Sequence, residues 1–97
     1  HGLRVTATLN GELRQDGRTD DLICEIPELL AFVTRNITLQ PGDVISTGTP
    51  MGVGIFRDPV ACMQPGDEIS IAIDRLGTLT NRVEALETRT ASPYPCP

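Results

Sequence analysis

Residues 4–15 read RVTATLNGELRQ, and this stretch decides how the chain begins to fold. The β-branched run of residues 4–9 favours a strand. Asn10-Gly11 follows directly and is a strong hairpin signal, because both residue types tolerate the positive φ of a tight turn. We expect residues 12–15 to be the returning strand and Asp16-Gly17 to be a further turn.

One helix is expected after this hairpin. Ile26, Leu29, Leu30 and Val33 are spaced at i, i+3, i+4 and i+7, which places them on one face of a helix. Pro27 suits the first helical turn, where its missing N–H group is not needed. The pattern predicts a single short amphipathic helix.

The second half of the chain returns to strand patterns and contains two similar segments. Residues 39–46 read LQPGDVIS and residues 63–70 read MQPGDEIS, so each copy predicts a Pro-Gly turn that leads into a strand. The alternation over residues 68–74 supports the second strand. Residues 78–86 read as a long last strand. The fold class expected is mostly β with one short helix (α+β).

Size and charge limit the classes of function. Ninety-seven residues make at most one domain with a thin core, and the only aromatic residues are Phe32, Phe56 and Tyr94. The net charge of −5 and the absence of Lys argue against nucleic acid or an anionic membrane as a partner. No apolar run approaches the length of about 20 residues that spans a bilayer. Three cysteines without a C-x-x-C pair fit reduced thiols in a cytoplasmic protein better than a disulfide framework or a zinc site.

The most unusual segment is residues 46–54, which read STGTPMGVG. Glycines allow a backbone to approach a ligand closely, successive N–H groups can bind an anion, and hydroxyls add uncharged donors. Such a loop suits a carboxylate. It lacks the Lys and the spacing of a nucleotide-binding phosphate loop. Spacing alone leaves two alternatives open, a structural turn after a buried strand at Val44-Ile45 and a ligand-binding loop.

The acidic residues do not suggest a metal site within this chain. Asp16, Asp20, Asp21, Glu25 and Glu28 are spread over a turn and a helix start, whereas Mg²⁺ or Mn²⁺ needs several convergent carboxylates. We read these residues as solvated surface acids. His1 is the only histidine, so neither a general base nor a Ser-His or Cys-His pair is evident.

Residues 9–83 resemble the C-terminal part of the fumarylacetoacetate hydrolase family, and especially its 2-hydroxyhepta-2,4-diene-1,7-dioate isomerase and acylpyruvate hydrolase-like members. The resemblance lies in a series of motifs in the right order: NGELRQ (residues 10–15), IPELLAF (26–32), TLQPGDVISTGTPMGVG (38–54) and IDRLGTLTN (73–81). It implies part of a mixed β-roll fold. We expect residues 1–90 to be the C-terminal part of such a catalytic domain and residues 91–97 to be an irregular Pro-rich tail.

The resemblance also implies a function. Family members hydrolyse, isomerise or decarboxylate 2-oxo or β-diketo acids with Mg²⁺ or Mn²⁺, which holds the oxo acid and stabilises an enolate. The threonine of the TGTP motif contacts the substrate carboxylate. Here the implied substrate-binding residues are Thr49, with Gly48 and Pro50 shaping the turn. The resemblance further implies a homodimer.

The family's metal-binding carboxylates, catalytic Lys and His–Glu pair lie upstream of the region matched, so we expect no catalytic residue and no metal ligand in this chain. We expect them in a missing N-terminal segment or a partner chain, which would leave the chain inactive in isolation. The alternative is a non-catalytic small β domain that binds an acid or a protein partner.

Overall fold

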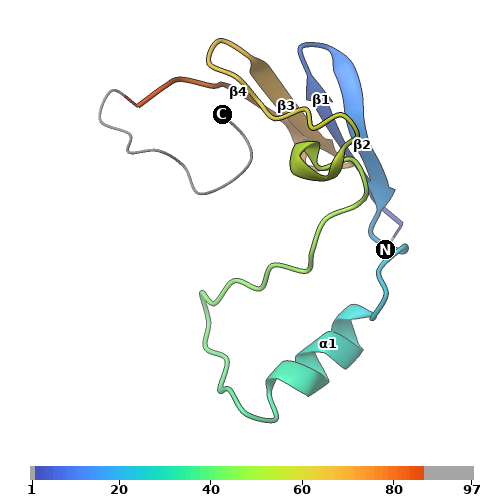
Figure 1. Ribbon diagram of the computed structural model, residues 1–97. Coiled ribbons are helices and arrows are strands. Elements are labelled where there is room, and N and C mark those ends of the chain that lie inside the picture. The colour runs from blue at the N-terminus through green and yellow to red at the C-terminus, as the bar shows by residue number, and fades with distance from the viewer. Residues whose placement is uncertain (1, 87–97) are drawn as a thin grey trace.

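The computed structural model describes residues 2–86, which form one antiparallel sheet, one α-helix and a long connecting segment (Figure 1). The strand order is β2-β1-β3-β4. The elements are β1 (Arg4–Leu9), β2 (Glu12–Arg18), α1 (Ile26–Val33), the 3-10 turn η1 (Gly54–Phe56), β3 (Glu68–Ile73) and β4 (Gly77–Arg82). This confirms a mostly β fold with one short helix.

The first hairpin forms as the sequence predicts. Asn10 and Gly11 take φ values of 50° and 81°, the left-handed conformations that a tight two-residue turn requires. The turn expected at Asp16-Gly17 is wrong, because β2 continues through both residues to Arg18 and pairs with β1 there. The register between β1 and β2 shifts between Ala7 and Thr8, which marks a β-bulge.

Strand β3 joins the hairpin from far along the chain and pairs antiparallel with β1. The Asn10 side chain fixes the start of β3, because its amide donates to Asp67 Oδ1 at 2.8 Å and its carbonyl oxygen accepts from the Glu68 N–H at 2.9 Å. Strand β4 ends at Arg82, four residues before the predicted end. The predicted Pro-rich tail and the end of the predicted domain lie outside the described residues.

The two QPGD segments fold alike, but only one leads into a strand. In both, the Gly has a positive φ (99° at Gly42 and 93° at Gly66), and the Asp carboxylate accepts a hydrogen bond from the backbone N–H of the Gln. The bond from Gln64, followed by that from Asn10, lowers the pKa of Asp67. The strand predicted after Gly42 is wrong. Residues 43–48 pair with no strand of the described chain, and Val44, which was expected to be buried, is 93% exposed.

Very little of residues 2–86 is buried. Only Ala7 and Leu9 among the described hydrophobic residues are buried, at 9% and 7% exposure. Helix α1 spans the apolar positions predicted to share one face, yet it buries none of its residues and contacts none of the strands. Figure 1 shows α1 well apart from the sheet, at the far end of the extended segment. The apolar helix face that the sequence predicts is therefore left without a packing partner within residues 2–86. No helix in this part of the chain is long and apolar enough to cross a membrane.

An ion pair between β1 and β2 gives a first testable prediction. Arg4 donates through Nε and Nη2 to the two carboxylate oxygens of Asp16, at 2.8 and 2.7 Å. This fork lowers the pKa of Asp16 below its ordinary value of 3.8. A carboxyl group whose pKa is lower in the folded state than in the unfolded state stabilises the fold at pH values above the unfolded-state pKa. This contribution is lost as the pH falls through the folded-state pKa.

We therefore expect Asp16→Asn to lower the thermal unfolding midpoint slightly at pH 7 and to have a smaller effect at pH 3. The pair is solvent-exposed, so added salt should also reduce the difference at pH 7. Thermal unfolding followed by circular dichroism at both pH values measures this, with Asp21→Asn as the exposed control. An equal loss at both pH values would contradict the assignment.

Candidate functional site

The Thr49 loop, defined as residues 46–54, lies against strand β2. The Gln15 side chain joins the two, because its Nε2 donates to Thr49 Oγ1 at 2.8 Å and to the Pro50 carbonyl oxygen at 2.7 Å. Both protons of one amide group are thus used on consecutive loop residues. The loop is fixed at its Thr-Pro step.

Two close approaches of the backbone complete the attachment of this loop. A Cβ atom added at Gly17 would lie 2.8 Å from Pro50 Cβ, so the Pro50 ring packs directly on the β2 backbone. A Cβ atom at Gly52 would collide with the carbonyl oxygen of Arg14. Gly52 also has a φ of 110°. Glycine is therefore required at both positions for the loop to reach the strand.

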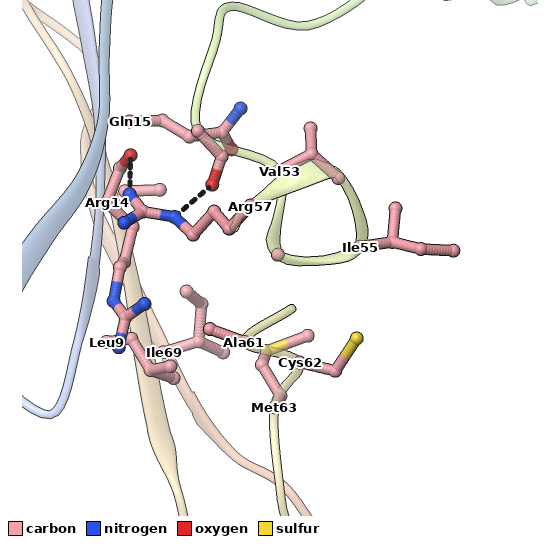
Figure 2. Close-up of a pocket in the computed structure, with 13 residues that line it drawn as sticks. Leu9, Arg14, Gln15, Val53, Ile55, Arg57, Ala61, Cys62, Met63 and Ile69 are labelled. Atoms are coloured by element: carbon pink, nitrogen blue, oxygen red, sulfur yellow. Dashed lines mark hydrogen bonds between the residues drawn. The ribbon is translucent and has the colours of Figure 1, made fainter. Parts of the chain in front are cut away.

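Arg57 holds the far end of the loop. Its Nε donates to the Gly52 carbonyl oxygen at 3.1 Å and its Nη2 donates to the Arg14 carbonyl oxygen at 2.9 Å. Figure 2 shows this guanidinium reaching from the segment after η1 across to β2. The short loop around η1 is itself closed by Ala61, whose N–H donates to the Gly54 carbonyl oxygen at 3.0 Å. Arg57 therefore stabilises the loop, because its Nε and Nη2 both donate to backbone carbonyl oxygens.

The three residues implied by the resemblance are consecutive in the sequence and lie in an exposed, irregular segment. Gly48 has a positive φ of 102°, and an added Cβ atom there would meet nothing within 4 Å. Pro50 packs on β2, and the Thr49 side chain is exposed to solvent. Sequence reasoning missed the roles of Gln15, Gly52 and Arg57. The NGELRQ motif contains Gln15, but its partners lie more than thirty residues away.

A pocket of 290 Å³ lies beside this loop, between the sheet and the segment around η1 (Figure 2). Thr49 does not line it. Most of the lining is apolar, including Leu9, Val53 and Ile69. At its wall the buried Arg14 Nε lacks a hydrogen bond, and it lies 3.5 Å from Glu12 Oε1 in a loose ion pair. The apolar lining suits a hydrocarbon group better than a carboxylate, so the exposed Thr49 turn is the better candidate for an acid.

The acidic residues of the described chain do not fit a Mg²⁺ or Mn²⁺ site. Within residues 2–86 no group of three or more His, Cys, Asp or Glu side chains is placed to hold a metal ion. Asp16 is bonded to Arg4, and Asp20 lies 3.0 Å from Arg18 Nε. The Arg18 hydrogen bond lowers the pKa of Asp20. Asp16 and Asp20 form ion pairs with arginines instead.

Comparison with known proteins identifies the family. Residues 1–84 match the family model described as fumarylacetoacetate (FAA) hydrolase C-terminal. Among solved structures, a fumarylacetoacetate hydrolase from the psychrophile Exiguobacterium antarcticum is 42% identical with a TM-score of 0.83, over 88% of this chain and 31% of that chain. A 5-carboxymethyl-2-hydroxymuconate delta-isomerase from Mycobacterium smegmatis is 38% identical with a TM-score of 0.72, over 86% and 30% of the two chains.

A third structure was solved with ligands. It is a maleylpyruvate hydrolase from Sphingobium sp. SYK-6 in complex with manganese(II) and pyruvate, 38% identical with a TM-score of 0.74, over 86% of this chain and 29% of that chain. The chain spans about a quarter of the length of the curated staphylococcal relatives that it matches, 26% of one and 27% of another. With a family model over 84 residues and a shared fold at this identity, the chain belongs to the fumarylacetoacetate hydrolase family.

Proposed function

We propose that this chain supplies the substrate-carboxylate loop of a divalent-metal-dependent enzyme that acts on 2-oxo or β-diketo acids. The reaction classes that fit are C–C bond hydrolysis, isomerisation and decarboxylation of acylpyruvates, oxaloacetate-like acids or hydroxymuconate-type acids. In this proposal Thr49 donates a hydrogen bond to the substrate carboxylate, while Gly48 and Pro50 hold the turn.

The observation that supports this role most directly is the fixed but exposed Thr49 hydroxyl. Its oxygen is held 2.8 Å from Gln15 Nε2, while the side chain remains open to solvent. A preset hydroxyl binds a ligand without the entropic cost of ordering a mobile loop. The similarity to a maleylpyruvate hydrolase solved with manganese and pyruvate supports a small oxo acid as the ligand class.

The proposal places the metal ligands and the catalytic Lys in protein that is not part of these 97 residues. The bound Mg²⁺ or Mn²⁺ would supply Lewis-acid stabilisation of an enolate, and this chain would bind and orient the carboxylate. In the proposal, these residues come from an N-terminal segment or from a second chain. The complete enzyme is a homodimer in this proposal. The unpartnered apolar face of α1, which includes the 39%-exposed Leu30, is a surface that such protein could cover.

Calorimetric titration with oxalate, a planar mimic of an oxo acid enolate, tests the proposal. We expect the protein, as its gene encodes it, to bind oxalate in the presence of Mg²⁺ and to lose this binding when the metal is removed with a chelator. Folded protein that binds no oxalate with either Mg²⁺ or Mn²⁺ would contradict the proposal. That result would favour the non-catalytic β domain instead.

A further inference from the structure

We propose that Gln15 is a positioning residue that commits the hydroxyl proton of Thr49 to the ligand. The inference rests on the proposed carboxylate contact of Thr49 and adds to it the residue that sets the direction of that hydrogen bond. It follows from the hydrogen-bonding capacities of three groups, namely the Gln15 amide, the Thr49 hydroxyl and the Pro50 carbonyl.

The Pro50 carbonyl oxygen fixes the orientation of the Gln15 amide. A carbonyl oxygen only accepts, so the Gln15 atom 2.7 Å away must be the NH₂ nitrogen and not the amide oxygen. The same nitrogen lies 2.8 Å from Thr49 Oγ1. Because an amide NH₂ group only donates, Thr49 Oγ1 must be the acceptor of this bond.

As a consequence, the hydroxyl proton of Thr49 is available to donate a hydrogen bond to a ligand. A threonine hydroxyl has one proton and two acceptor lone pairs. Gln15 occupies a lone pair, and no hydrogen bond donated by Thr49 Oγ1 is found among residues 2–86. An exposed hydroxyl in this state is a ready donor. It complements a ligand group that only accepts hydrogen bonds, such as a carboxylate. It does not complement a group that donates them.

Gln15 faces the loop because it pairs with Ala7, and a β-bulge brings Arg14 to the same side. Ala7 pairs with Gln15 and Thr8 pairs with Leu13, so Arg14 is the additional residue on β2. Side chains alternate between the two faces of a regular strand, and a bulge re-aims them. Here Arg14 and Gln15 both line the side of the sheet that faces the loop, as Figure 2 shows. A β2 strand without the bulge would present only one of these two side chains to that side.

The test is a double-mutant cycle on oxalate binding, measured by calorimetry in the Mn²⁺-loaded protein as its gene encodes it. We expect Gln15→Leu to weaken oxalate binding about 10-fold when Thr49 is present, and less than about 2-fold in a Thr49→Val background, since the hydroxyl is then absent. Gln15→Glu should weaken binding at least as much, because a carboxylate at this position would accept the Thr49 proton. Gln64→Leu is the matched control and should leave binding unchanged. The Mn²⁺ affinity, titrated separately, should not change in any variant.

The outcomes separate this inference from the proposed function. If Thr49→Val weakens oxalate binding but Gln15→Leu does not, the positioning role is wrong and the carboxylate contact remains. If Gln15→Leu weakens binding equally in both backgrounds, Gln15 supports the loop without directing the hydroxyl, and the inference also fails. If Thr49→Val has no effect, the proposed carboxylate contact itself is wrong. Should the Leu variant unfold, Gln15→Glu in both Thr49 backgrounds gives the same comparison with an isosteric side chain.

Discussion

Replacing Gly52 with alanine is expected to release the Thr49 loop from β2 and to lower the free energy of unfolding by about 2–4 kcal/mol. Two causes add. The φ of 110° at Gly52 is strained for any residue with a Cβ atom, and that atom would collide with the carbonyl oxygen of Arg14. The same oxygen accepts the hydrogen bond from Arg57 Nη2, so moving it away also breaks that bond.

Gly42→Ala is the matched control for this experiment. Gly42 has a similar φ of 99°, but an added Cβ atom would meet nothing within 4 Å. We expect it to cost about 1 kcal/mol from backbone strain alone. Urea denaturation gives both energies, and the NMR signals of the Gln15 side-chain amide report whether the loop has left the strand. Equal losses for the two variants would show that Gly52 is needed only for its φ and not for the close approach to Arg14.

The parts of the fold that could be predicted from sequence are those that local conformational preferences determine. Asn10 and Gly11 form the expected tight turn, both QPGD segments form the same turn, and α1 forms where the apolar spacing predicts a helix. In each case the residues that set the backbone conformation lie within a few positions of one another. Local sequence could not predict which turn would lead into a strand. That depends on whether β1 and β4 pair with the segment, and of the two copies they pair with the second, which forms β3.

The candidate site shows the same division between local and distant effects. The resemblance pointed to Thr49, Gly48 and Pro50, which lie in an exposed, irregular segment, and their role in binding a carboxylate stays a prediction. The residues that hold this segment come from elsewhere in the chain: Gln15 is separated from Thr49 by 34 positions, and Arg57 from Arg14 by 43. The glycine at position 17 was read as a turn signal. In the structure it makes room for Pro50 within a continuing strand, and a single sequence cannot distinguish these two uses of glycine.

Thr49→Val is expected to weaken oxalate binding by about 10- to 100-fold in the metal-loaded protein. A hydrogen bond to a charged group contributes about 1.5–3 kcal/mol, and each 1.4 kcal/mol corresponds to a factor of ten in the dissociation constant. Valine has nearly the shape of threonine, and the Thr49 side chain is exposed, so little else should change. The Gln15 amide would keep its bond to the Pro50 carbonyl oxygen, which should hold the turn in place.

Two further measurements show whether the loss arises at the carboxylate. Thr49→Ser keeps the hydroxyl and should bind oxalate within about 3-fold of the unchanged protein, whereas a role in packing would make serine nearly as harmful as valine. Mn²⁺ titrated without oxalate should bind all three proteins alike, because Thr49 is assigned to the substrate and not to the metal. If valine reduced the affinity for Mn²⁺ and for oxalate in parallel, Thr49 would act through the metal site. If valine changed neither affinity, this turn would be structural, the alternative that the sequence alone leaves open.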